Sequence, residues 1–298
     1  MKIAIAGASG LIGRALTRAL RVAGHDVVRL VRRATVADDE IAWNPEKGEW
    51  DAARWRGIDA VVNLAGENIA AGRWTAARRE RILRSRLDAT RTLVRAMNAF
   101  ESRPRVFLSA SAVGFYGDRG DELLTEASAI GNGFLSEVCL AWETHAEGAA
   151  RSGVRTALLR FGTVLAGEGG ALGKMRPIFR CGLGGRLGSG RQWMSWIAID
   201  DAVGAILHAL RDERCAGALN IVAPAPVPNA EFTRTLGRVL HRPAWLPVPA
   251  WALRVAFGRM ADDALLASTR AVPEKLGAAG YAFRHPTLES ALRAALEA

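Results

Sequence analysis

The sequence opens on an apolar run, a glycine-rich turn and an amphipathic stretch. Ile3 to Ala6 are consecutive apolar residues, which is typical of a buried parallel strand. From Ala15 to Val22 the apolar residues recur at helical spacing. Gly7, Gly10 and Gly13 separate these two stretches. The start of the chain therefore predicts a strand, a glycine turn and a helix in that order.

The same alternation continues along the chain. Apolar runs predict further strands at 27–31, 59–66, 105–108, 154–159 and 219–222, an extended segment at 193–199, and a small hairpin at 43–50. Helical spacing predicts helices at 76–98, 134–150, 200–210, 231–240, around 251–267 and at 288–296. Strands that alternate with helices favour an α/β fold, a doubly wound parallel sheet of the Rossmann type.

The glycine turn indicates a dinucleotide site. Gly7 allows a tight turn, Gly10 lets the backbone approach a pyrophosphate, and Gly13 lets the helix pack close to the strand. Ser9, Leu11 and Ile12 complete the turn, and the helix N-terminus presents free N–H groups to phosphate. The alternative is a glycine-rich turn of a doubly wound fold that binds nothing.

Two arginines follow the second predicted strand. An NAD site usually has a carboxylate there, about 20 residues past the glycines, to bind the ribose 2′-hydroxyl. This chain has Arg32 and Arg33 instead, and guanidinium groups suit a 2′-phosphate. We therefore expect NADP(H) rather than NAD as the cofactor; the alternative is that these are two exposed arginines of a basic protein.

Composition changes this picture little. Half of the 298 residues are hydrophobic and 23% are charged, as in ordinary globular proteins. The formal net charge of +10 suggests a nucleic-acid partner, but the arginines are spread along the chain without a block of like charge. We expect neither a nucleic-acid nor a membrane partner, since no apolar run is long enough to cross a bilayer. A homodimer is an open alternative to a monomer.

Cysteine usage and the N-terminus favour the cytoplasm. The three cysteines are scattered without metal-ligand spacing, so no metal site is expected. Such a sparse, odd number suits a reducing compartment. Met1 leads directly into the first predicted strand, so no signal peptide is expected.

Several motifs together resemble the extended short-chain dehydrogenase/reductase superfamily, of the nucleotide-sugar epimerase type. They are Gly7–Gly13, Asn63-Leu64-Ala65-Gly66, Ser109-Ala110-Ser111, Arg160-Phe161-Gly162 and Ile199-Asp200-Asp201. The resemblance implies a seven-stranded Rossmann sheet with a small substrate domain. It also implies cofactor contacts from Leu64, Ala65, Gly66, Ser109 and Arg160.

A narrower match resembles an atypical epimerase-family subgroup with a C-terminal region of uncharacterised role. Its signatures are Gly66-Glu67-Asn68-Ile69, Arg73-Trp74, Ser85-Arg86, the stretch 190–196, Pro273-Glu274-Lys275 and Arg284-His285-Pro286. Some members of that subgroup carry a label as cell-division inhibitors. We expect a dinucleotide-binding core at 1–165, completed by 192–223. The segments 166–191 and 224–298 are expected to form the smaller domain, with 166–190 as loops across the cofactor site.

The usual chemistry of the superfamily is absent. Typical members use a Tyr-x-x-x-Lys pair, in which the tyrosine is the general acid/base and the lysine lowers its pKa. This chain has only Tyr116 and Tyr281, and no lysine lies between Lys47 and Lys174. The standard mechanism is therefore excluded by composition.

Other residues remain as candidates. Ser111 matches the catalytic serine of the superfamily, and Tyr116 is the default acid/base; a turn-stabilising serine and a packed tyrosine are the alternatives. Glu67, Asn68, Trp74 and Trp193 are candidate substrate contacts. Two functions remain open: an NADP(H)-dependent oxidoreductase or epimerase-like enzyme with an unknown small-molecule substrate, or a non-catalytic NADP(H)-binding redox sensor or cell-division regulator.

Overall fold

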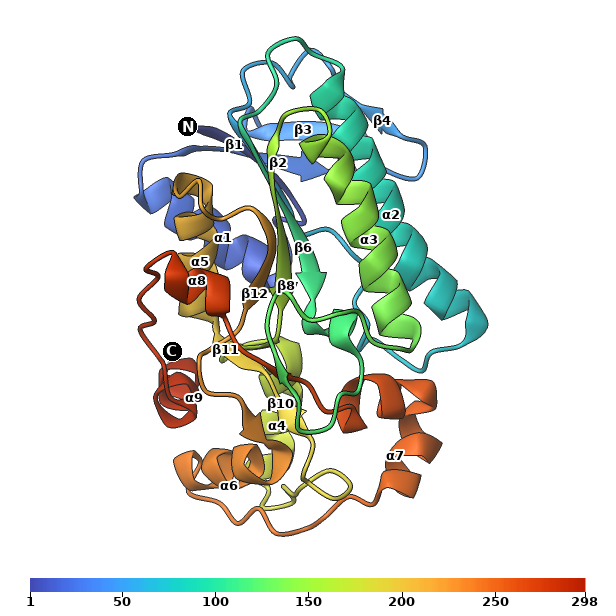
Figure 1. Ribbon diagram of the computed structural model, residues 1–298, viewed down its shortest axis with the longest axis vertical. Coiled ribbons are helices and arrows are strands. Elements are labelled where there is room, and N and C mark those ends of the chain that lie inside the picture. The colour runs from blue at the N-terminus through green and yellow to red at the C-terminus, as the bar shows by residue number, and fades with distance from the viewer. Residues whose placement is uncertain (298) are drawn as a thin grey trace.

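A central sheet organises the molecule, which the computed structural model describes for residues 1–297 (Figure 1). The eight strands lie in the order β12-β8-β6-β5-β1-β2-β3-β4. Their bounds are β1 Lys2–Ala6, β2 Asp26–Val31, β3 Glu40–Asn44, β4 Glu49–Trp50, β5 Ala60–Asn63, β6 Val106–Ala112, β8 Arg155–Phe161 and β12 Gly217–Ile221. All neighbours are parallel except β3 and β4, which form the predicted hairpin. The predicted doubly wound α/β fold is confirmed.

Helices cover both faces of the sheet. The helices α1 (Leu11–Val22) and α5 (Ile199–Arg211) pack on one face, and α2 (Ala76–Asn98) and α3 (Phe134–Ala150) on the other (Figure 1). Successive side chains of a strand point to opposite faces. In β1, Ile3 and Ile5 accordingly join the apolar cluster of the first face, while Ala4 and Ala6 join that of the second.

The carboxyl ends of the strands meet a smaller lobe, at the bottom of Figure 1. Its elements are η1 Val113–Tyr116, β7 Leu123–Leu124, β9 Thr163–Leu165, α4 Gly170–Arg180, β10 Trp193–Met194, β11 Trp196–Ala198, β13 Val227–Pro228, α6 Asn229–Val239, α7 Ala250–Phe257, the π-helix η2 Ala261–Leu266, β14 Arg270–Ala271 and α9 Leu288–Glu297. The short helix α8 Glu274–Ala278 lies instead against β12, beside α5 (Figure 1). A separate apolar cluster, which includes Phe179, Trp196, Phe232 and Leu292, holds much of this lobe together.

Two parts of the lobe differ from the sequence-based expectation. The segment 166–190 contains the helix α4 rather than loops alone. The helix buries Leu172 and Phe179, but the glycines and Pro177 of the segment obscure this helical spacing in the sequence. Residues near 270–283 lead back to the core: β14 pairs with β7 in a separate two-stranded sheet, and Leu276 of α8 lies in the main core. The chain therefore crosses between core and lobe more often than the expected boundaries imply.

The sheet topology places a cleft. From β1 the chain proceeds outward to β2 and β3, and then returns to β5 on the other side of β1 before continuing to β6, β8 and β12. Ligands of open α/β sheets bind at such a reversal, outside the carboxyl ends of the strands. The expected position of the site is therefore above β1, β2 and β5.

Candidate functional site

The glycine turn joins β1 to α1. At two of its glycines, neighbouring backbone leaves no room for a side chain. Gly7 has φ +79°, and a Cβ on it would lie 2.6 Å from the backbone of Leu64. A Cβ on Gly13 would lie 2.1 Å from the carbonyl oxygen of Gly7. Both contacts are too close for any real side chain, so these glycines bring the turn against the 64–65 loop and α1 against the turn.

Gly10 is different because a side chain there would meet a single neighbouring atom. A Cβ on Gly10 would meet only the carbonyl oxygen of Gly7 at 3.2 Å. Gly10 is also the N-cap of α1 and offers no side chain to cap the helix. The first-turn N–H groups of Leu11, Ile12 and Gly13 therefore point outward without a side-chain partner, which is the arrangement that binds phosphate.

A cleft of about 1030 Å³ opens beside this turn. It is lined by Gly7–Gly10, by α1, by the end of β2, by Leu64–Glu67 after β5, and by Ser85, Asp88 and Ala89 of α2. Of the expected cofactor residues, Gly7, Ser9, Gly10, Arg32, Arg33, Leu64, Ala65 and Gly66 contribute to the lining. The structure therefore brings together segments that are far apart in the sequence.

Six arginines line the cleft, and they are not equivalent. They are Arg14, Arg18, Arg21, Arg29, Arg32 and Arg33. Arg33 donates to both carboxylate oxygens of Glu40, and Arg29 donates to both of Asp39. Arg14, Arg18 and Arg32 form no ion pair with any carboxylate of residues 1–297.

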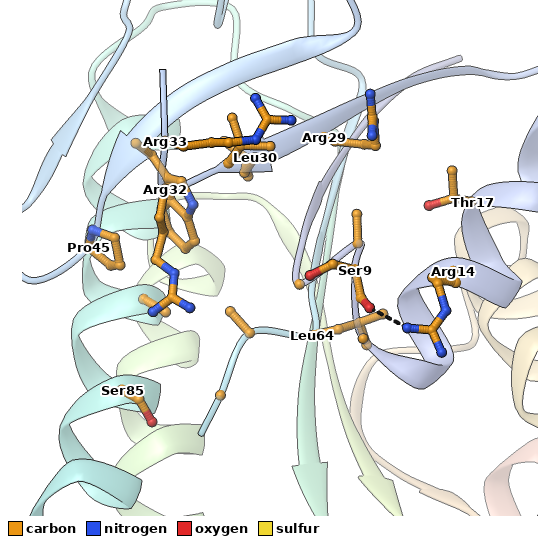
Figure 2. Close-up of a pocket in the computed structure, with 18 of the residues that line it drawn as sticks. Ser9, Arg14, Thr17, Arg29, Leu30, Arg32, Arg33, Pro45, Leu64 and Ser85 are labelled. Carbon is orange, nitrogen blue, oxygen red and sulfur yellow. Dashed lines mark hydrogen bonds between the residues drawn. The ribbon is translucent and has the colours of Figure 1, made fainter. Parts of the chain in front are cut away.

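Arg32 is the guanidinium that points into the cleft. In Figure 2 its side chain extends from the end of β2 toward α2 and Ser85, whereas Arg33 turns back along β2. The hydrogen bond from Arg33 lowers the pKa of Glu40, and the hydrogen bond from Arg29 lowers the pKa of Asp39. These two arginines are thus neutralised by carboxylates, while Arg32 keeps its charge available to an anion.

Ser111 lies at the end of β6 in a buried polar network. Its hydroxyl donates to Oε1 of Glu143 at 2.6 Å. Arg160 binds the same carboxylate through Nε and Nη2, at 2.9 and 2.7 Å. Arg160 also donates from Nη1 to the Tyr116 hydroxyl at 3.0 Å, and that hydroxyl donates to Asn220 at 2.7 Å. Each of these side chains is satisfied inside the protein.

This network corrects three expectations. Tyr116 is fully buried, and its hydroxyl is occupied by Asn220 and Arg160, so the structure argues against it as the acid/base. Arg160 is buried against Glu143 rather than placed in the cleft. Ser109 is fully buried and accepts from Asn63 at 3.4 Å, so its hydroxyl does not face the cleft either. A pattern of residues did not reveal that these side chains point into the core.

Two positions of α3 near the end of β6 carry neither a phenol nor an amine. Leu135 and Cys139 lie four residues apart on α3, with Leu135 against Gly114 and the Cys139 thiol donating to the Ala112 carbonyl at 3.7 Å. Burial raises the pKa of the Cys139 thiol to about 11.

Of the four expected substrate contacts, Glu67 alone is among the residues that line the cleft. The backbone N–H of Glu67 donates to the Ser85 hydroxyl, and its carboxylate lies 3.5 Å from the Arg78 guanidinium. Asn68 accepts from the Ala70 N–H in a local turn. Trp74 is buried against Phe134 and donates to the Ile69 carbonyl, which makes it a support of the loop rather than a contact surface. Trp193 donates to Asp121 and lies under Arg270.

Sequence reasoning missed the arginines of α1. Arg14, Arg18 and Arg21 occur at spacings of four and three, so they share one helix face, and that face borders the cleft. The helical spacing was visible in the sequence, but the side of α1 that meets the cleft was not. Arg86, which follows the cleft-lining Ser85, was noted only as part of a motif.

Residues 1–297 contain no group of three histidine, cysteine or acidic side chains placed to hold a metal ion. Among them, no helix combines the length and the apolar character needed to span a membrane.

Comparisons with known proteins place the chain in a family. The model of the NAD dependent epimerase/dehydratase family matches residues 3–221, and a domain of unknown function matches residues 248–295. An epimerase family protein of Mycobacterium tuberculosis is 47% identical over 290 residues, which are 97% of this chain and 96% of the relative.

Solved structures agree. A crystal structure of human epimerase family protein SDR39U1 with NADPH has a TM-score of 0.90 and 34% identity, covering 100% of this chain and 99% of that one. A UDP-glucuronic acid 4-epimerase from Bacillus cereus, with UDP-glucuronic acid and NAD, has a TM-score of 0.79 at 16% identity, covering 100% and 98%, and is similar in fold alone. The chain therefore belongs to the NAD dependent epimerase/dehydratase family, as an atypical extended short-chain dehydrogenase/reductase with an additional C-terminal domain of unknown function.

Proposed function

We propose that this protein binds NADP(H) in the arginine-lined cleft and acts as an NADP(H)-dependent oxidoreductase on a small polar substrate. The observation that carries the proposal is the pairing of an open glycine turn at Gly10 with an uncompensated guanidinium at Arg32. The turn suits a pyrophosphate and the guanidinium suits a 2′-phosphate. The NADPH in the human relative supports the same choice of cofactor.

The residues of this chain divide the work of holding the cofactor. The N–H groups at the start of α1 would bind the pyrophosphate, and Arg32 would bind the 2′-phosphate, with Arg14 and Arg18 adding positive charge nearby. The segment Leu64–Gly66 would cover the cofactor from the side of β5. When bound, the nicotinamide supplies or accepts a hydride.

The proton for such a reaction needs a source other than the usual tyrosine. Tyr116 is buried in the core, and the Ser111 hydroxyl is committed to Glu143. We therefore propose that water or the substrate itself provides the proton, which favours substrates whose oxygen is easily protonated. The proposed compartment is the cytoplasm, because no disulfide joins the three cysteines.

The test has a binding part and a turnover part. Calorimetric titration of the purified protein with NADPH and with NADH should give tighter binding of NADPH, by at least tenfold. Anaerobic incubation with NADPH and a library of small carbonyl compounds should then identify a substrate by loss of absorbance at the reduced nicotinamide band. Equal affinities for the two cofactors would overturn the cofactor assignment.

A second function is favoured by the missing acid/base. Leu135 lies against Gly114 and Cys139 against Ala112, so neither a phenol nor an amine stands at these two α3 positions, and a protein that binds NADP(H) without turning it over is the competing proposal. Such a sensor would bind NADPH tightly, show no turnover with any carbonyl compound, and change its affinity for a partner protein between the oxidised and reduced cofactor. Measured turnover would decide for the oxidoreductase.

A further inference from the structure

Arg86 lies immediately behind the loop that lines the cleft. It belongs to α2, and its guanidinium carbon lies 5.0 Å from the ring centre of Trp142 on α3. A Cβ on Gly66 would lie 3.2 Å from that carbon. The guanidinium therefore occupies the space between α2 and α3, at the carboxyl edge of the sheet and next to the last residue of the Leu64–Gly66 segment.

This guanidinium has no counterion within the protein. Its Nη1 donates to the carbonyl oxygens of Glu67 and Ile82, at 3.2 and 2.9 Å. Its Nε and Nη2 donate no hydrogen bond to any of residues 1–297, and no carboxylate of those residues forms an ion pair with it. Burial lowers the pKa of Arg86, although arginine stays protonated. The two carbonyls and the Trp142 ring offset part of the cost of burying this cation, and Nε and Nη2 keep donors that a ligand can use.

Arg86 lies next to Gly66 and Ser85, which line the cleft on the side of β5. In a doubly wound fold the two halves of the cofactor lie on opposite sides of the strand-order reversal. Arg32 and β2 mark the half on one side, and Gly10 marks the centre. Gly66 follows β5 on the other side, where the Cys139 thiol of α3 reaches Ala112 at the end of β6 and Trp142 of the same helix contacts Arg86.

We propose that Arg86 forms a binding subsite for the nicotinamide ribose, donating from its free N–H groups to the ribose hydroxyls. The proposal rests on the proposed NADP(H) function and extends it to a residue on α2. A guanidinium suits this task because its fixed, planar donors match a pair of adjacent hydroxyl oxygens. The competing use of the same cation, binding of an acidic group on the substrate, is an outcome that the following experiment separates.

The experiment uses three ligands that share the adenosine 2′-phosphate end. Adenosine 2′,5′-bisphosphate lacks the second ribose, 2′-phospho-ADP-ribose has it without the nicotinamide, and NADPH has both. Dissociation constants are measured by calorimetry for the full-length wild type and for Arg86→Met. Arg84→Met is the matched control, because Arg84 lies on the same helix, is exposed, and pairs only with Glu80.

Arg86→Met should leave the affinity for the bisphosphate within about twofold of wild type. It should weaken 2′-phospho-ADP-ribose and NADPH equally, by about 10- to 100-fold, as expected when charge-assisted hydrogen bonds are lost. Arg84→Met should change none of the three. If Arg86→Met fails to fold, Arg86→Gln keeps donors at the site, and it should show the same ligand order with a smaller loss.

Two results would overturn the subsite. Unchanged affinities for all three ligands would leave Arg86 to an acidic substrate, and an equal loss for all three would mean that Arg86 only supports the Glu67 loop. Both differ from failure of the proposed function, in which the wild type itself binds none of the three ligands.

Discussion

Arg160 and Glu143 form a buried, two-pronged ion pair between β8 and α3. The guanidinium donates to both carboxylate oxygens, at 2.9 and 2.7 Å, and both side chains are about 6% exposed. Burial alone would lower the pKa of Arg160, but the hydrogen bonds and charge of Glu143 outweigh it and raise that pKa. The pair therefore stays ionised and anchors Ser111 and Tyr116 on either side.

Breaking this pair should destabilise the fold. Arg160→Met leaves the Glu143 carboxylate buried without a counterion, so we expect a loss of about 3–5 kcal/mol in the free energy of unfolding. Urea denaturation followed by circular dichroism measures it. Arg84→Met, on the exposed face of α2, is the control and should shift the midpoint little. The double variant Arg160→Met/Glu143→Leu should recover part of the loss, and no recovery would show that shape rather than charge sets the cost.

The two arginines after β2 should differ in their effect on cofactor choice. Arg32→Ala removes an uncompensated guanidinium from the cleft, so NADPH affinity should fall by about 1.5–3 kcal/mol while NADH affinity stays unchanged. Arg33→Ala removes a group already paired with Glu40, and its effect on NADPH should be smaller. Calorimetric titration of both variants with both cofactors decides this. A larger loss for Arg33→Ala would mean that the Glu40 pair opens on binding.

Two glycines of the turn should respond in opposite ways. Gly10→Val places a side chain at the cleft with its Cβ 3.2 Å from the Gly7 carbonyl oxygen, so cofactor binding should be lost while the melting temperature falls much less than in Gly13→Ala. Gly13→Ala forces a Cβ to 2.1 Å from the Gly7 carbonyl, so the fold itself should be destabilised. Thermal melts and NADPH titrations of the two variants separate the roles. Retained binding in Gly10→Val would mean that no phosphate passes over this residue.

Local pattern was enough to predict the fold but only half of the site. The helices at 76–98 and 134–150 and the hairpin near Trp43 follow from spacing and turn residues, which are properties of neighbouring positions. The position of the cleft could be predicted for the same reason, because the glycine turn that borders it is a local pattern.

The direction of individual side chains did not follow from local pattern. Ser109 and Arg160 lie in motifs associated with cofactor binding, yet both point into the core, because their partners Asn63 and Glu143 lie on other elements. Arg32 and Arg33 are adjacent and looked equivalent until Glu40, seven positions beyond Arg33, was seen to bind one of them. Contacts of this kind depend on the packing of whole elements.

The cysteines should differ in reactivity with pH. Burial raises the pKa of Cys139 to about 11, so its thiol stays neutral and unreactive at pH 8, whereas Cys181 is exposed. Iodoacetamide labelling followed by mass spectrometry should modify Cys181 first, and labelling of Cys139 should rise only as the pH nears 11. In urea at pH 8 the two should label alike. Rapid labelling of native Cys139 at pH 8 would mean that the α3 end opens readily.

Tyr116→Phe tests whether the buried tyrosine supports the fold or the chemistry. Its hydroxyl bridges Asn220 and Arg160, and burial raises its pKa despite the nearby charge of Arg160. Removing the hydroxyl leaves the Asn220 oxygen and an Arg160 N–H without this partner, so unfolding should become easier by about 1–3 kcal/mol.

Turnover should behave differently from stability in the same variant. Because Tyr116 is fully buried, a rate with NADPH and any substrate found should stay within about twofold of wild type. Tyr281→Phe is the matched control: it removes the other tyrosine hydroxyl, which donates to the Asp201 carbonyl, and should likewise cost stability and spare the rate. General acid catalysis is typically worth about 100- to 10,000-fold. A rate loss of that size in Tyr116→Phe, at unchanged stability, would return Tyr116 to the role of proton donor and would require the protein to open around it during the reaction.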